Sequence, residues 1–436
     1  MRRVENYVEV QHFLNQVCAR IQAKELHRNV RDELAGHIAD RAEALLLEGM
    51  DEKQAVQAAV SQMGNPDEVG KGLNKAHKPA HDWLFMIAII SLAGIGILAM
   101  ATVQEAMGSE LGGLLFRNKI IYMLLGTAVL FGCYFLDYRK LKPLTSYLYG
   151  GAIVVMGLTL LLGTEINGTR SWLAIGPLGF RTGAVAVLLL LISLSGATPA
   201  RQWGKRTNQL YQLTLRYLLP AGLLAATATL PYVMLYTIGF IVFVWTTRTD
   251  KKQLLLLSLP ILSGAVIFVT RDSSLFDRIS EFLSRDARYN YHSVEMVKAV
   301  QSAGWTGHGF ASRIDTLPYI YSESILPYFI YCFGWAAGLF LVSVIFIFVA
   351  RLWHMLKRLH DHYATVLGCS LLVYFGFQFM WPLLASFGVL PVISMEIPFI
   401  AYGGTTQILH FAAAGLWMSL YRRKNRIASA GNGELA

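Results

Sequence analysis

The sequence predicts an all-α, polytopic membrane protein with about ten transmembrane helices and a small soluble N-terminal helical bundle. Hydrophobic residues make up 54% of the 436 residues, and charged residues make up only 15%, against about 25% in soluble proteins. The charges are concentrated in residues 1–82. The remainder consists of recurring apolar runs of about 20 residues, the length of helix that crosses a bilayer.

Residues 1–76 are predicted to form a separate cytoplasmic helical domain. Leu14, Val17 and Ile21 recur at helical spacing, as do apolar residues between 30 and 47. Gly49 and the Gly-Asn-Pro string at 64–66 are helix stop signals. Several short helices around one core and no catalytic role are the expectation for this domain.

The transmembrane domain is predicted over residues 83–425, followed by a cytoplasmic tail at 426–436. The fifth and sixth spans are the least distinct, because Pro220 and Pro231 interrupt their apolar run. The predicted spans are 83–103, 119–136, 146–163, 181–198, 211–229, 231–247, 253–270, 325–350, 364–388 and 397–420.

Clusters of Lys and Arg set the expected orientation, because short cytoplasmic loops carry an excess of these residues. A basic cluster follows each even-numbered span, so both termini are expected to be cytoplasmic. The formal net charge of +10 is therefore attributed to topology, and no nucleic-acid partner is expected. The four cysteines form no CxxC pair, and no metal site is expected.

Two loops on the opposite, outer side are long enough to carry chemistry. One covers residues 164–180, and the larger one covers residues 271–324. Loops of about 50 residues between spans are uncommon and are often functional.

Several short strings resemble one family when they are taken together and in order. Asn-Gly-Thr-Arg-Ser-Trp-Leu stands at 167–173, Gly-Trp-Thr-Gly-His-Gly at 304–309, and Ile-Pro-Phe-Ile-Ala-Tyr-Gly-Gly-Thr-Thr at 397–406. Over residues 83–425 the chain resembles the SEDS family, which includes FtsW, RodA and SpoVE. The N-terminal region resembles the helical prefix domain of some bacterial permeases.

The resemblance implies a protein of the bacterial cytoplasmic membrane that acts in cell shape, division or sporulation. It implies a peptidoglycan glycosyltransferase that uses a lipid-linked disaccharide precursor beside a penicillin-binding transpeptidase. Glu323 aligns with the family's catalytic Asp, and a carboxylate there could act as general base. Because Glu is one methylene longer than Asp, its geometry is altered. The alternative is that Glu323 is an ordinary loop carboxylate.

Further residues are expected to bind substrate or membrane lipid. Arg170 and Arg278 suit a diphosphate, because a guanidinium can donate two parallel N–H hydrogen bonds to phosphate oxygens. An interfacial anchor is the alternative for Trp172, and a loop ion pair is the alternative for Arg278. No cofactor is indicated, and a divalent cation at the diphosphate is chemically reasonable although no residues mark its site. The predicted binding residues are Asn167, Arg170, Trp172, Arg278, Gln378 and Tyr402.

The chain departs from the family at ionisable positions. Where the family has Gln-Pro-Ser-Glu and a nearby Lys, this chain has Arg-Thr-Gly-Ala at 181–184 and Val187. Ionisable residues in spans are usually functional, so their loss favours a catalytically degenerate scaffold that binds a transpeptidase. A flippase for the precursor is a further alternative, which the expected outer cavity and the permease-like prefix motivate. Arg181 could replace the missing cation, but an interfacial residue that extends toward water is the favoured interpretation.

Overall fold

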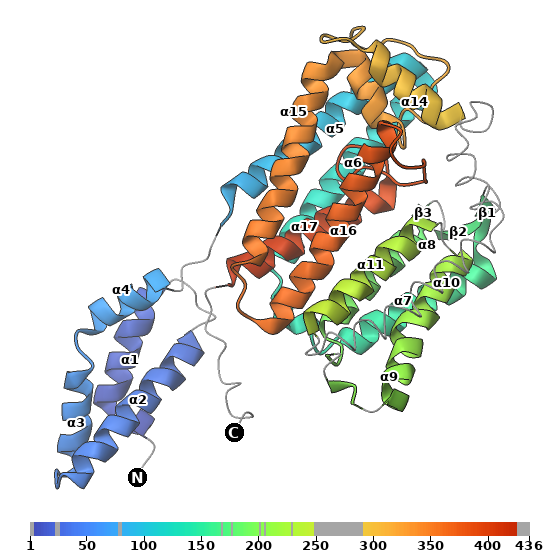
Figure 1. The fold of residues 1–436 in the computed structure, drawn as a ribbon. Helices are drawn as coiled ribbons and strands as arrows, with labels where there is room; N and C mark the ends of the chain where they lie inside the picture. The colour runs from blue at the N-terminus through green and yellow to red at the C-terminus, as the bar shows by residue number, and fades with distance from the viewer. Residues whose placement is uncertain are drawn as a thin grey trace. The chain divides into compact units, whose positions relative to one another are not determined.

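A computed structural model describes most of the chain, which divides into two compact units, one of residues 1–81 with 422–436 and one of residues 82–421 (Figure 1). The described residues are 4–21, 27–76, 81–166, 169–175, 178–199, 202–204, 206–227, 230–247 and 291–424. The predicted seventh span at 253–270 and the first part of the large loop lie outside them.

The N-terminal unit is a bundle of short helices around one apolar core. Its helices are α1 (Val8–Arg20), α2 (His27–Leu47), α3 (Glu52–Gln62) and α4 (Pro66–Ala76), preceded by the 3-10 turn η1 (Val4–Asn6). Val10, Val17 and Ile38 are fully buried in the core. On the surface, Arg20 Nε lies 2.8 Å from Asp67 Oδ1 and joins α1 to α4.

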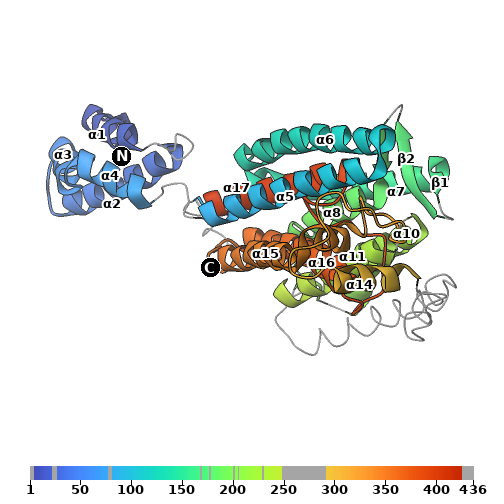
Figure 2. The ribbon, with the colours of Figure 1, turned by 90° about the horizontal axis from the view of Figure 1, so that it is seen from above.

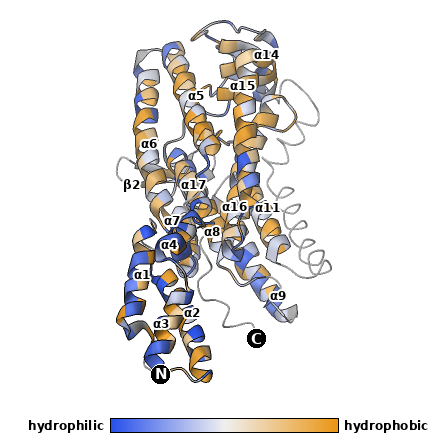
Figure 3. Ribbon diagram, turned by 90° about the vertical axis from the view of Figure 1, so that its left-hand side faces the viewer, coloured by the Kyte–Doolittle hydropathy of each residue, from blue (hydrophilic) through white to orange (hydrophobic). Residues whose placement is uncertain are grey.

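The second unit is built from long apolar helices. Figure 3 shows hydrophobic residues over most of their length. Many large apolar side chains stay exposed, as expected of a surface that faces lipid; examples are Ile90, Leu124, Leu161 and Phe346. The helices are α5 (Trp83–Met107), α6 (Ser109–Phe135), α7 (Thr145–Leu162), α8 (Thr182–Ser195), α9 (Arg206–Leu213), α10 (Leu219–Thr227), α11 (Leu230–Thr247), α14 (Tyr291–Ser302), α15 (Ile325–Leu356), α16 (His362–Ser386) and α17 (Gly404–Arg422).

The predicted class of polytopic helical membrane protein is confirmed. Among the described residues, five helices are long and apolar enough to cross a membrane: α5, the Glu110–Phe135 part of α6, α7, α15 and α16. Two shorter apolar helices, Thr182–Ser195 and Pro231–Thr247, correspond to the predicted fourth and sixth spans. The predicted fifth span is a continuous helical path of α9, the π-helical turn η5 (Thr214–Leu218) and α10.

The predicted start of the tenth span is wrong, because α17 begins at Gly404 and not at residue 397. The preceding segment cannot continue a helix toward its N-terminus. Pro398 disfavours the helical conformation of the residue before it, and Phe399 has a positive φ of 66°. The helix therefore starts after the Tyr-Gly-Gly string, where the sequence also indicates a break.

The outer loop at 164–180 contains a small antiparallel sheet that the sequence did not predict. Its strands, in the order β1-β2-β3, are β1 (Thr164–Ile166), β2 (Thr169–Ile175) and β3 (Leu178–Arg181). Trp172 of β2 stands opposite Arg181 at the end of β3. The sheet leads directly into α8 and so places Arg181 at the N-terminal end of that helix.

A glycine-rich turn at 304–309 packs against a break in α15. Gly334 interrupts the helix with φ 81° and ψ 177°, a conformation that is open essentially only to glycine. His308 N donates to Tyr331 O at 3.0 Å, and Trp335 N donates to Gly304 O at 2.9 Å. These bonds serve backbone groups that the break leaves without helical partners, which agrees with a structural role for His308.

Gly334→Ala is expected to destabilise the second unit by about 1–3 kcal/mol, the cost of forcing a side chain into such a conformation. A Cβ at this position would also meet Trp305 O at 2.3 Å. The measurement is the temperature at which half of the detergent-purified protein is lost from its monodisperse peak. Gly376→Ala in α16 is the control, because its Cβ would meet no atom within 4 Å; equal midpoints in the two variants would contradict the prediction.

Candidate active site

Three parts of the chain that are far apart in the sequence meet at one end of the second unit. They are α14 with the residues 303–324 that follow it, the β3–α8 junction, and residues 387–403; Figure 2 shows the sheet and α14 at the same end. Tyr402 N donates to Tyr321 O at 2.8 Å, and Thr405 Oγ1 donates to Gly179 O at 3.2 Å. Both predicted outer loops therefore contribute to one region.

Glu323 lies in this region with its side chain 19% exposed. Its Oε2 is 3.9 Å from Nδ1 of His292, in the first turn of α14. His292 Nε2 is also 2.8 Å from the hydroxyl of Ser324, the buried N-cap residue of α15. A helix N-terminus favours negative charge, and the Glu323 carboxylate beside it stays partly accessible.

The turn that presents Glu323 has an unusual backbone. Tyr319 adopts a φ of 53°, and its carbonyl accepts hydrogen bonds from Ser322 N at 3.0 Å and Ser324 N at 3.2 Å. Non-glycine residues in this conformation gather at functional sites. Beside it, burial raises the pKa of the Tyr321 phenol, and the nearby Tyr319 and Glu323 raise it further, so the phenol remains a neutral donor at physiological pH.

Arg181 and Glu396 form a buried ion pair in the same region. Arg181 Nη1 lies 3.1 Å from Glu396 Oε1, with the two side chains 9% and 15% exposed. Arg181 also donates to Ser394 O at 2.9 Å, and Thr406 Oγ1 donates to Glu396 Oε2 at 2.7 Å. The interpretation of Arg181 as a water-facing interfacial residue is therefore wrong. Its guanidinium also interacts electrostatically with Glu323, which connects the pair to the candidate base.

A buried lysine supports the segment that carries Glu396 and Tyr402. Lys119 of α6 is fully buried, and its amine donates to Phe399 O at 2.9 Å, Ile400 O at 3.0 Å and Ala401 O at 2.8 Å. Non-helical backbone within a membrane protein needs such partners, because lipid supplies none. Lys119 is thus the reason that α17 can begin late without orphaned carbonyls.

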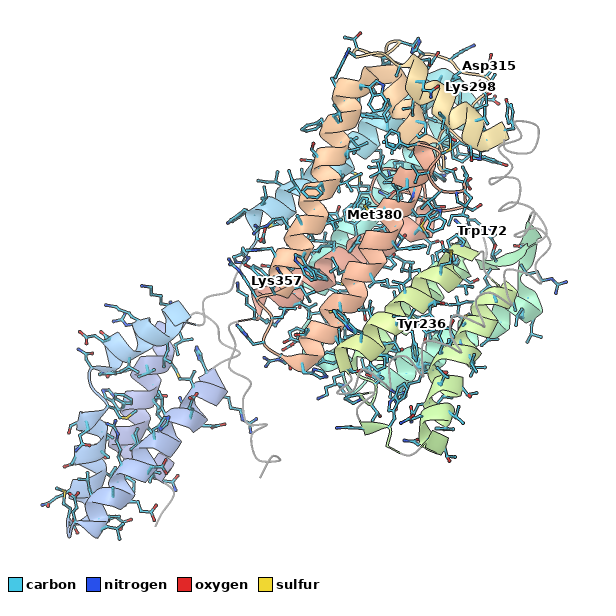
Figure 4. The ribbon with its side chains drawn as sticks, viewed as in Figure 1. Trp172, Tyr236, Lys298, Asp315, Lys357 and Met380 are labelled. Carbon is cyan, nitrogen blue, oxygen red and sulfur yellow. The ribbon has the colours of Figure 1, made fainter. Side chains whose placement is uncertain are left out.

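The predicted binding residues are placed differently from one another. Two of them lie at the site. The ring of Tyr402 contacts the ring of Tyr321, and Trp172 pairs with Arg181 across strands β2 and β3; Figure 4 labels Trp172 at the sheet. Arg170 is exposed, and its Nη1 lies 3.4 Å from Leu160 O near the end of α7. Asn167 and Arg278 are outside the described residues.

Gln378 is buried inside the helix bundle. Its Oε1 is 2.8 Å from Nε2 of His410 on α17, and His410 in turn interacts electrostatically with Lys119. The side chain therefore belongs to a polar cluster inside the bundle, and its role in binding substrate stays a prediction.

Sequence reasoning missed His292, Glu396 and Lys119. Glu396 is a lone carboxylate just before the predicted tenth span, and Lys119 is the first residue of the predicted second span. An ionisable residue at a span edge was a usable signal for both. His292 had no such signal, since it opens a mixed loop segment.

The fold and these buried charges define a polytopic membrane protein with a candidate catalytic carboxylate at one end of its bundle. A family model described as "Cell cycle protein", for FtsW, RodA and SpoVE proteins, matches residues 82–426. The chain belongs to this family, as its sequence predicts.

Curated relatives and solved structures agree with this assignment. The chain is 22% identical to a "Probable peptidoglycan glycosyltransferase FtsW" of Nitrosomonas europaea, over 80% of this chain and 94% of that protein. It is 24% identical to the "Peptidoglycan glycosyltransferase MrdB" of Helicobacter pylori, over 72% and 84%.

Two solved structures share the fold. A chain of a peptidoglycan synthase complex matches with TM-score 0.66 and 23% identity, and RodA of Thermus thermophilus matches with TM-score 0.59 and 22% identity. Each match covers 79% of this chain and 98% of the other. The segment before residue 82 lies outside the family match.

Proposed function

We propose that the protein is a peptidoglycan glycosyltransferase that polymerises glycan from a lipid-linked disaccharide, with Glu323 as general base. The observation that carries the proposal is the accessible Glu323 carboxylate beside His292 and the N-terminus of α15. Relatives named as peptidoglycan glycosyltransferases support it.

In the proposed reaction, the Glu323 carboxylate takes the proton of a sugar hydroxyl. The hydroxyl oxygen then forms a bond to the anomeric carbon of the donor, and the bond from that carbon to the lipid diphosphate breaks. A positioned base of this kind contributes about 10²–10⁴-fold. His292 lies beside the carboxylate, with Nδ1 3.9 Å from Oε2, and Arg181 supplies positive charge near the developing negative charge of the diphosphate.

The substrate-binding assignments remain proposals. Placement favours Tyr402 and Trp172, which lie with the site, whereas Arg170 and Gln378 have partners elsewhere in the protein. Within the described residues, no group of three or more His, Cys, Asp or Glu side chains could hold a metal ion.

Glycan polymerisation by purified protein tests the proposal. Glu323→Gln is expected to lower the rate at least about 100-fold, because an amide cannot take the proton. Asp315→Asn is the matched control, since Asp315 is an exposed carboxylate of the same segment. Glu323→Asp, which restores the family's residue, should keep activity; equal rates for wild type and Glu323→Gln would contradict the proposal.

A second candidate function is a scaffold that has the fold without catalysis. It is favoured by Ala184 and Val187, which are buried apolar residues where the family has a carboxylate and a lysine. No polymer from correctly folded wild-type protein, with and without a penicillin-binding transpeptidase, would support the scaffold. Such a transpeptidase is our proposed partner, and the match to a chain of a peptidoglycan synthase complex supports it.

We also propose that the protein lies in the bacterial cytoplasmic membrane with both termini and the N-terminal helical unit in the cytoplasm. The basic clusters that follow the even-numbered spans support this orientation. Labelling of single cysteines introduced at Arg28 and Asp315 from one side of the membrane tests it. Only the cysteine at residue 315 is expected to react from outside.

A further inference from the structure

A polar cavity of about 350 Å³ lies at the end of the second unit where α7 begins and α8 ends. It is formed by the first turn of α7, the residues after α8, the π-helical turn η5 and Tyr236 of α11. Figure 4 labels Tyr236 between these helices. The cavity takes no part in the proposed glycosyl transfer, because Arg181 of that site lies at the β3–α8 junction, at the other end of α8.

The described residues that line the cavity include two cations and no carboxylate. Lys142 and Arg216 supply the positive charges, and the hydroxyls of Thr145, Ser146 and Thr198 supply further polar groups. The ionisable side chains that interact with Arg216 are tyrosines. Its positive charge is therefore uncompensated within the described part of the protein, and a half-buried charge in that state favours an anionic ligand.

The wall that carries Arg216 is held in place by tyrosines. The π-helical turn shifts carbonyls out of the ordinary helical pattern, and the hydroxyls of Tyr149 and Tyr236 donate to the carbonyls of Leu215 and Arg216. Arg216 Nη1 donates to Thr198 O at 3.1 Å, and Nη2 lies 3.2 Å from Thr198 Oγ1. Because a guanidinium has five N–H donors, donors remain for an anion in a fixed position.

The surroundings of the cavity favour a lipid as the source of that anion. Large apolar side chains next to it in the chain are exposed, among them Leu144, Leu218 and Leu219. Such a surface contacts acyl chains in a bilayer, while cations at the ends of spans meet lipid phosphates. A phosphate in the cavity would thus be attached to tails that the neighbouring leucines can contact.

We infer that this cavity is a binding site for the phosphate headgroup of an anionic membrane lipid, at the membrane face that carries the basic clusters. Arg216 binds the phosphate through its remaining N–H donors, and Lys142 adds a second positive charge at the rim.

Native mass spectrometry of the full chain with phosphatidylglycerol or phosphatidylcholine tests this inference. Wild type is expected to retain phosphatidylglycerol preferentially, and Arg216→Gln is expected to bind it about tenfold more weakly, a loss typical of a charge-assisted hydrogen bond. Lys142→Gln should weaken binding by a smaller factor. Lys140→Gln is the matched control, because Lys140 is exposed two residues earlier and does not line the cavity.

Equal loss of phosphatidylglycerol in Lys140→Gln and Lys142→Gln would overturn the site. Equal retention of the two lipids by wild type would do the same. If inorganic phosphate alone stabilised the protein against heat and phosphatidylglycerol did not, the ligand would be a soluble anion and the lipid would be excluded. Since Lys142 is exposed, its variant keeps the test valid even if Arg216→Gln fails to fold.

Discussion

Lys119→Met is expected to destabilise the second unit by about 3 kcal/mol. The substitution keeps the length of the side chain but removes the donor for three carbonyls, and each buried unsatisfied group costs about 1–3 kcal/mol. Relief of the desolvation of the lysine amine offsets part of this cost. The half-loss temperature on heating in detergent is the measurement.

Lys140→Met separates this effect from a general consequence of losing a lysine, because Lys140 is exposed. Its half-loss temperature should equal that of wild type. The Lys119→Met variant should also lower glycan polymerisation, since the released segment carries both Glu396 and Tyr402. A Lys119→Met protein with the wild-type midpoint would show that residues 399–401 do not depend on the lysine.

The long helices were predictable because a bilayer leaves the chain few choices. Backbone groups in lipid must be paired within the segment, so apolar runs of about 20 residues become helices. The break at Tyr402–Gly404 also had a local signal, in its paired glycines and Pro398. The sheet at 164–181 had no sequence signal of comparable strength, because its strands are short and β1 has only three residues.

The burial and the partners of these charges were not predictable from local sequence, although a place at a span edge marked Lys119 and Glu396 as candidates. Lys119 appeared to mark the edge of a span, because the apolar run starts there, whereas α6 begins at Ser109 and places it ten residues inside the helix. From sequence alone, Arg181 could not be distinguished from an interfacial residue that extends toward water, because its partner Glu396 is 215 residues away. Only the folded chain brings these groups together.

Arg181→Met is expected to cost about 3–5 kcal/mol, because it leaves Glu396 buried without its counter-ion. Adding Glu396→Gln should recover much of this loss. The glutamine is neutral and can still accept the hydrogen bond from Thr406 that the carboxylate accepts. Residues in direct contact couple by about 0.5–3 kcal/mol in such cycles, so the double variant should be more stable than Arg181→Met alone.

Activity separates the roles of this pair. If Arg181 helps to stabilise the leaving diphosphate, the double variant regains its half-loss temperature but not its rate of glycan polymerisation. Arg313→Met is the control for both measurements, because Arg313 is an exposed arginine of the segment before Glu323. A double variant no more stable than Arg181→Met would refute the ion pair as the source of the cost. Full recovery of polymerisation would limit Arg181 to a structural role beside Glu323.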